Sequence, residues 1–192
     1  MNKAKQLVFL LSIGVFFTAC ESEYSRTVKS ELKTGVVHED LILGLKIGQT
    51  QKEFYDQCWQ LNKEKIVHQG PGNRFARQYI LLDSTAQDAK KVDMLFYGIF
   101  DQEKVMHGMH MIMSYVAWSP WAKEYQATIL LEELKKKYLR EYAGNPFIEI
   151  TIDEDIKAYA KVDGNRQIIL YPSSDKDVTV KIQDLRHKVR NE

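Results

Sequence analysis

The sequence predicts an α+β fold in which helices cover one face of an antiparallel sheet and leave the other face to solvent or to a partner. Two segments carry apolar residues at helical spacing, and each is followed by segments in which apolar and polar residues alternate. Turn sequences such as Asp163-Gly164 join alternating segments, which is typical of hairpins. We therefore expect two tandem helix-plus-antiparallel-strand units, in the order α-β-β-β-α-β-β-β-β, that form one layered domain over residues 41–192.

The first predicted helix begins after Thr50. Thr50 and Glu53 form the T-x-x-E pattern of a capping box, and Phe54, Cys58 and Leu61 then recur on one helical face. Cys58 lies on this buried stripe, so we interpret it as a core residue rather than a reactive thiol. Three strands are then predicted over 77–82, 92–100 and 105–118.

The second predicted helix begins at Ser119, a plausible N-cap, with Pro120 in the first helical position. Its apolar stripe ends before the Gly-Asn-Pro sequence at 144–146. The stripe consists of Ala127, Leu131, Leu134, Tyr138 and Tyr142. Strands are predicted over 147–152, 156–162 and 166–171. The segment 178–182 alternates as a fourth strand would, and a terminal helix from Asp184 is an alternative for the end of the chain.

The first residues have the three-part pattern of a secretory signal. Lys3 and Lys5 precede an apolar segment, 7–17, which is followed by the small residues Thr18 and Ala19. The apolar segment is shorter than the roughly 20 residues that a bilayer-spanning helix needs. The sequence therefore predicts a signal peptide over residues 1–19 and export from the cytoplasm.

Cys20, directly after the small residues, resembles the cysteine of a bacterial lipobox, although Phe17 stands where Leu is usual. The resemblance implies cleavage before Cys20, acylation of its thiol and new amine with palmitate-type chains, and a lipid-anchored place in the bacterial cell envelope, with the outer membrane favoured over the inner. An ordinary secreted protein with an unmodified cysteine, or an uncleaved anchor, is the alternative. Residues 20–40 then form the lipidated cysteine and a polar tether, because 21–40 show no sustained period.

A second resemblance concerns the segment LGLKIGQTQKEF, which looks like the G-x-T-plus-helix opening of small envelope lipoproteins of the SmpA/OmlA type. The matching positions are Gly48, Thr50 and Phe54. Two helix-and-strand units in series are similar in layout to the tandem architecture of the β-lactamase-inhibitory-protein type. Both resemblances imply a non-catalytic module that binds another envelope protein, as a scaffold, adaptor or inhibitor.

Composition and motifs argue against several classes of function. The formal net charge is +1, which argues against a nucleic-acid partner. The sequence has no H-E-x-x-H, G-x-S-x-G, P-loop or G-x-G-x-x-G pattern, so we expect neither an enzyme nor a cofactor. A hydrolase with carboxylates dispersed along the sequence is a further alternative, because such pairs need not be close in sequence.

The segment MHGMHMIM contains residue types that bind Cu(I). In a strand, His107, Met109, Met111 and Met113 share one face and His110 points the other way. Four such ligands span about 20 Å along a strand, too far for one ion. We therefore expect the methionines to fill the core and predict no metal site.

Aromatic residues gather where the third predicted strand meets the second predicted helix. Trp118, Trp121 and Tyr115 are a candidate binding site, which would suit a small-ligand or glycan-binding lipoprotein as the alternative function. The simpler interpretation is that both tryptophans seal the helix onto the sheet.

Overall fold

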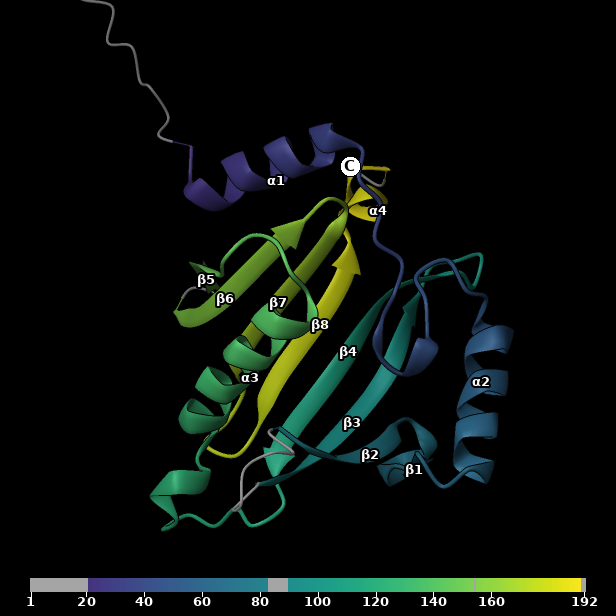
Figure 1. The fold of residues 1–192 in the computed structure, drawn as a ribbon, viewed down its shortest axis with the longest axis vertical. Coiled ribbons are helices and arrows are strands. Elements are labelled where there is room, and N and C mark those ends of the chain that lie inside the picture. The colour runs from purple at the N-terminus through teal and green to yellow at the C-terminus, as the bar shows by residue number, and fades with distance from the viewer. Residues whose placement is uncertain (1–20, 83–89, 154, 191–192) are drawn as a thin grey trace, which may run out of the picture.

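The computed structural model describes residues 21–82, 90–153 and 155–190, and it confirms the α+β class (Figure 1). The described strands form one eight-stranded antiparallel sheet in the order β1-β2-β3-β4-β8-β7-β6-β5. The helices are α1 (Glu23–Thr34), α2 (Gln51–Lys63), α3 (Ala127–Glu141) and α4 (Leu185–Arg190). The strands are β1 (His68–Gln69), β2 (Ala76–Leu81), β3 (Lys91–Phe100), β4 (Met106–Tyr115), β5 (Ile148–Ile152), β6 (Ile156–Asp163), β7 (Arg166–Pro172) and β8 (Val178–Asp184).

All seven predicted strands occur, although the one predicted over 105–118 ends at Tyr115, and β1 was not predicted. The predicted start of α2 is confirmed. The Thr50 side chain accepts from the Glu53 backbone N–H, and the Glu53 carboxylate accepts from the Thr50 N–H. Two backbone N–H groups at the start of the helix, which have no partner within the helix, are thereby hydrogen-bonded. The chain also forms β8 followed by α4, so both alternatives for its end occur, one after the other.

The predicted start of the second helix is wrong. α3 begins at Ala127 rather than at Ser119, and residues 116–126 form turns with a short 3-10 segment, Lys123–Tyr125. The Gln126 side chain donates to the carbonyl oxygens of Ser119 and Ala122, at 2.9 and 2.8 Å. These local bonds hold the segment as turns that connect β4 to α3.

An irregular tether was expected over 21–40, but residues 23–34 form α1. Ser22 caps its start, and Gly35 ends it in the left-handed conformation at φ 70°. Tyr24, Val28 and Leu32 recur every fourth residue within an otherwise polar sequence. This narrow stripe is a weak sequence signal, and much of the helix's support comes from the sheet that it contacts, at β5 and β6.

The two faces of the sheet differ. On the face that the helices cover, Met109, Met111 and Met113 of β4 are fully buried, and the Tyr138 hydroxyl of α3 donates to the Met111 sulfur at 3.6 Å. The expected core role of these methionines is confirmed. A bulge opposite Ile99 interrupts the alternation, so that Met106 is buried too, while the half-buried His107 ring stacks on His187 at 3.8 Å.

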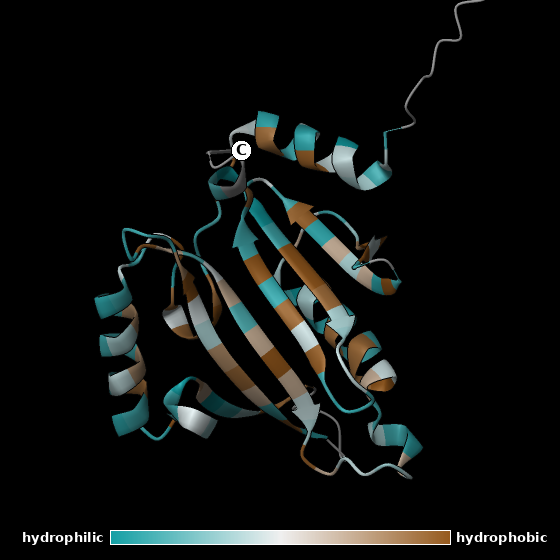
Figure 2. Cartoon of the chain, turned by 180° about the vertical axis from the view of Figure 1, so that it is seen from behind, coloured by the Kyte–Doolittle hydropathy of each residue, from teal (hydrophilic) through white to brown (hydrophobic). Residues whose placement is uncertain are grey.

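The opposite face, which we call the open face, is uncovered over β3, β4, β8 and the later part of β7 in the described part of the chain (Figure 2). At the start of β7 the Gln167 side chain is 0% exposed and donates to the Tyr24 hydroxyl of α1. The residues of the open face are those whose side chains alternate with the buried ones. They are Leu95, Tyr97, His110, Ile112, Thr179, Lys181, Ile169 and Tyr171. The antiparallel sheet therefore has one face buried under helices and one face largely exposed to solvent, as its alternating sequence predicts.

Candidate functional site

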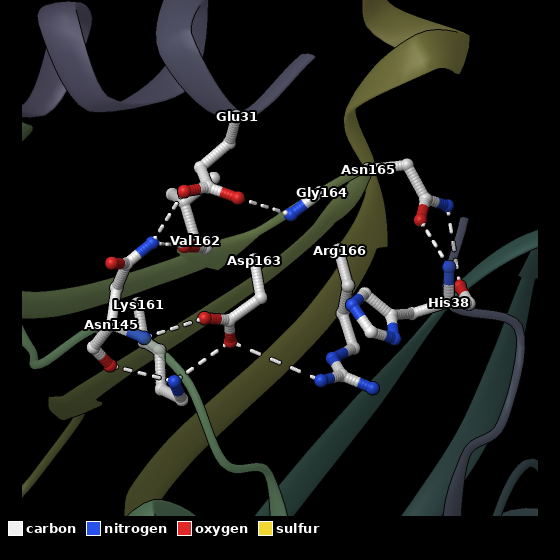
Figure 3. A network of polar contacts seen from close by, with 9 residues as sticks. All are labelled: Glu31, His38, Asn145, Lys161, Val162, Asp163, Gly164, Asn165 and Arg166. Carbon is white, nitrogen blue, oxygen red and sulfur yellow. Dashed lines mark hydrogen bonds and ion pairs between the residues drawn. The ribbon is translucent and has the colours of Figure 1, made fainter. Parts of the chain in front are cut away.

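A buried polar cluster lies where β6 turns into β7 (Figure 3). Lys161 Nζ lies 2.7 Å from Asp163 Oδ2 and donates to the Asn145 carbonyl oxygen at 2.6 Å. The Asn145 N–H donates to Asp163 Oδ1 at 2.7 Å. Lys161 is 0% exposed and Asp163 5%, so these charges are removed from water and compensated by one another.

The same cluster extends to the end of α3. The Arg166 guanidinium lies 3.9 Å from Asp163 and 4.5 Å from the centre of the Tyr142 ring. Burial lowers the pKa of Arg166. Gly144 has φ 134°, and a Cβ there would come within 2.1 Å of Asp163 Oδ1. With no room for a side chain at Gly144, the cluster is a closed joint rather than an accessible site.

The N-terminal segments are attached to the same joint. The Glu31 carboxylate of α1 accepts from the Gly164 N–H at 2.8 Å and from Asn145 Nδ2 at 2.7 Å, and the bond from Gly164 is the main reason that its pKa is lowered. Asn165 accepts from the His38 N–H at 2.6 Å and donates to the His38 carbonyl oxygen at 3.2 Å. These contacts fix α1 and the following segment to the sheet.

On the open face, the pairing of neighbouring strands aligns aromatic and cationic side chains in a row across the sheet. Tyr97 of β3 stands opposite His110 of β4, and His110 stands opposite Lys181 of β8. The Tyr97 hydroxyl lies 2.8 Å from His110 Nδ1, and the two ring centres are 5.0 Å apart. Lys181 Nζ lies 5.8 Å from the centre of the Tyr171 ring. We call Tyr97, His110, Lys181 and Tyr171 the central row.

The central row carries positive charge without a matching anion. Burial lowers the pKa of His110, and the Lys181 ammonium lowers it further, so the ring is neutral at about pH 7. His110 Nε2 has no hydrogen-bond partner, and Lys181 no ion pair, among the residues that the structure describes. The acidic side chain of neighbouring β3, Asp93, lies 3.1 Å from Arg77 and is thus compensated. An incoming carboxylate would meet an available cation at the central row.

Apolar side chains flank the central row. Leu95, Ile112 and Ile169 lie beside it on β3, β4 and β7, and all three are partly exposed. Aromatic side chains are enriched at the centres of protein interfaces, so the aromatic and apolar part of this surface has the composition of an interface, while Lys181 adds a charge that a partner must match.

A second surface feature is a cleft between α2 and the segment that runs through β1 into β2. Its volume is about 800 Å³, within the range of small-ligand sites. Buried Phe54, Val67 and Phe96 form its floor, while Tyr55 and Trp59 of α2 are 58% and 61% exposed. We call it the aromatic cleft.

Cys58 also lines the aromatic cleft. It is partly buried against the core, as predicted, and it forms no disulfide in the described part of the chain. Burial raises the pKa of its thiol to about 11, so the reactive thiolate is not populated near neutral pH. Cys58 therefore contributes shape rather than nucleophilic chemistry.

The three aromatic residues singled out in the sequence are placed differently from one another. Tyr115 is 1% exposed and its ring meets Tyr125 edge-on at 5.4 Å, so it lies inside the protein. Trp118 is half-buried, with Lys176 Nζ 5.8 Å from its ring centre, and Trp121 is 84% exposed. Within this group only Trp121 is well placed to touch a partner. Cys20 lies outside the described residues.

Sequence reasoning did not single out the central row or the aromatic cleft. The central row could not be found without knowing that β4 pairs with β8, which are distant in sequence. The four-residue spacing of Tyr55 and Trp59 beside the apolar stripe of α2 was the available signal for the cleft.

No helix among the described residues has the length and apolar character needed to cross a bilayer. No three or more His, Cys, Asp or Glu side chains in the described ranges are grouped as metal ligands would be. Comparison with protein-family models, with curated proteins and with solved structures finds no match to this chain.

Proposed function

We propose that this protein is a membrane-anchored bacterial envelope lipoprotein that acts as a non-catalytic module for binding another envelope protein. The observation that carries the proposal is the open face, where the uncompensated Lys181 lies among apolar and aromatic side chains. The signal-like N-terminus and the lipobox-like position of Cys20 support the anchor.

The state of the titratable side chains favours binding over catalysis. The Cys58 thiol is protonated and His110 is neutral near pH 7, and neither lies against a partner that would activate it as a nucleophile or base. The buried charges of Lys161 and Asp163 serve the joint between α3 and the sheet. The charged groups that remain are best suited to recognition.

We also propose that the fold consists of two tandem units. One is α2 with β1–β4, and the other is α3 with β5–β8. Each unit runs from a helix into consecutive antiparallel strands, and the last strands of the two units, β4 and β8, pair in the middle of the sheet. Joining the units in this way produces one continuous open face, wide enough for a protein partner.

The partner that fits this face presents a carboxylate surrounded by apolar residues. The carboxylate pairs with the Lys181 ammonium, while Leu95, Ile112 and Tyr171 supply apolar contact. Such a pair is desolvated at the centre of the interface, where a charge contributes most to specificity.

The test is chemical cross-linking of the tagged, full-length protein in its native envelope, followed by mass spectrometry. We expect one dominant partner, whose yield falls at least about tenfold in Lys181→Glu because the two charges would then repel. Lys136→Glu is the matched control, since Lys136 is exposed on α3 away from the open face. Equal yields in the two variants, or no dominant partner with the native protein, would refute the proposal. Cys20→Ser tests the anchor separately, because loss of lipid should release the protein from the membrane.

A binding site for a small molecule or glycan is the second candidate function, and the aromatic cleft is the observation that favours it. The ligand site around Trp118, Trp121 and Tyr115 also stays a proposal, for which Trp121 is the exposed anchor.

A further inference from the structure

The aromatic cleft combines flat apolar surfaces with uncharged polar groups. On α2, Tyr55 and Trp59 line the cleft and are separated by four residues, which corresponds to about 6 Å along the helix axis. Both rings are more than half exposed although they belong to a helix that packs against the core. Large exposed aromatic rings on a cleft wall are suited to stacking against a ligand.

The polar lining of the cleft is dominated by amides rather than by charges. Gln51 and Asn62 come from the α2 side, and Gln69 and Asn73 come from the opposite wall. Some of this capacity is used within the protein, since Asn62 Nδ2 donates to the Val67 carbonyl oxygen at 3.0 Å and Gln69 bonds to Asn73. The Gln51 side chain makes no hydrogen bond to a residue that the structure describes.

Few charges face the cleft. Asp56 is paired with Lys52 at 2.5 Å, whereas Arg74 forms no ion pair within the described ranges. His68 also lines the cleft, with its ring centre 6.5 Å from that of Tyr79. The cleft therefore offers one available guanidinium, one imidazole and several amides.

This donor set excludes two classes of ligand. A purely apolar molecule would cover the amides without giving them hydrogen bonds, which is unfavourable. A polyphosphate would need several cations, and among the described lining residues only Arg74 carries a permanent positive charge. The remaining class is polar, nearly uncharged, and flat on at least one side.

We propose that the aromatic cleft binds an oligosaccharide, which goes beyond the protein-binding function of the open face. A sugar ring has an apolar C–H face that stacks on Trp59 and Tyr55 and hydroxyl groups that exchange hydrogen bonds with Gln51, Asn62 and Arg74. The buried floor at Phe54 and Phe96 holds the stacking wall in place, so the site is formed before the ligand arrives.

The test is binding of the full-length protein, in a detergent without a sugar headgroup, to a printed array of bacterial, plant and fungal oligosaccharides. We expect the native protein to bind a related set of glycans and Trp59→Ala to bind them at least about tenfold more weakly, through loss of the stacking surface. Ile129→Ala is the matched control, because it removes an exposed apolar side chain of α3 that does not line the cleft. Trp121→Ala distinguishes the cleft from the other candidate ligand site. The three side chains are exposed, so none of these variants should alter folding.

A second measurement tests whether the ligand binds beside Trp59. In a Trp118→Phe/Trp121→Phe background, Trp59 is the remaining tryptophan of the sequence, and its fluorescence should shift as an array-positive oligosaccharide is titrated. No glycan bound by the native protein, unchanged binding by Trp59→Ala, or loss in Trp121→Ala would each overturn the proposal. Failure of glycan binding is separable from failure of the protein-binding function, because Trp59→Ala should still cross-link to its partner and Lys181→Glu should still bind the glycan.

Discussion

α3 and α2 are of similar length, but α3 buries many more of its side chains than α2 does. α3 buries residues from its first turn to its last against the covered face. They are Ala127, Leu130, Leu131, Leu134 and Tyr138. α2 buries only Phe54 and turns Tyr55 and Trp59 outward along the aromatic cleft. The difference teaches that one helix supports the sheet with a fully buried stripe, while the other, with Phe54 buried and Cys58 and Leu61 partly buried, leaves space for a ligand.

The ends of the two helices differ as well. α3 is followed by the joint in which Asn145 bonds to both Lys161 and Asp163. α2 is fastened mainly at its start, by the capping box of Thr50 and Glu53. Variants that weaken each attachment should therefore have graded effects on the free energy of unfolding, with the joint largest and the capping box smallest.

The largest effect is expected for Lys161→Ala. It leaves the buried Asp163 carboxylate without its closest cation, and removing one partner of a buried pair costs about 3–5 kcal/mol. Urea unfolding followed by circular dichroism measures the change. The matched control is Lys157→Ala on the same strand, where the ion pair to Glu149 is exposed, and its midpoint should barely move. Equal midpoints for the two variants would mean that the joint does not stabilise the fold.

The next effect concerns the packing of α3. Leu134→Ala should lower the free energy of unfolding by about 3 kcal/mol, because Leu134 is fully buried and the cavity left behind cannot be filled. Leu139→Ala, on the same helix but 42% exposed, should change it by less than about 1 kcal/mol. A thermal or urea melt of both variants measures the contrast. If the two variants lost similar amounts of unfolding free energy, the Leu134 face of α3 would not be the face that packs against the sheet.

The smallest effect is a pH dependence at the start of α2. Hydrogen bonds from the Thr50 backbone N–H and hydroxyl lower the pKa of Glu53 in the folded state. The stabilisation is therefore complete above the unfolded pKa of about 4.3 and is lost as the pH falls through the folded value. Glu53→Gln keeps the bond to the Thr50 N–H but cannot titrate, so its stability should fall less steeply between about pH 5 and pH 3.

The control for that measurement is Glu103→Gln, which removes a carboxylate from the exposed turn after β3 that bonds to no described residue. It should leave the pH dependence of the native protein unchanged. A steeper loss of stability in acid for Glu53→Gln than for the native protein would mean that folding does not lower the pKa of Glu53.

Local patterns were enough to predict much of this fold. The capping box at Thr50 is a contact between neighbours in sequence, and the alternation around Met109, Met111 and Met113 decides which side chains enter the core. These features depend on a few adjacent residues, so the sequence displays them directly.

Other features depend on partners far along the chain. α1 is fixed by Glu31 through Gly164, and at the start of α3 the Ala127 N–H donates to the Asp175 carbonyl oxygen at 2.8 Å. Lys161 and Lys157 lie on the same strand, but only Lys161 is buried, where Asn145 and Asp163 compensate its charge. Long-range contacts of this kind leave no periodic trace in the sequence.

The pairing of β4 with β8 also determines the order in which the protein can fold. Met109 stands opposite Ile182, so the middle of the sheet joins two strands that lie far apart in the sequence, and closing so long a loop is slow. Until β8 arrives, the methionine-rich β4 is an unpaired edge on a half-built sheet, which is the kind of intermediate that aggregates. A chaperone that shields β4 until the C-terminal strand has been delivered should therefore raise the yield of folded protein.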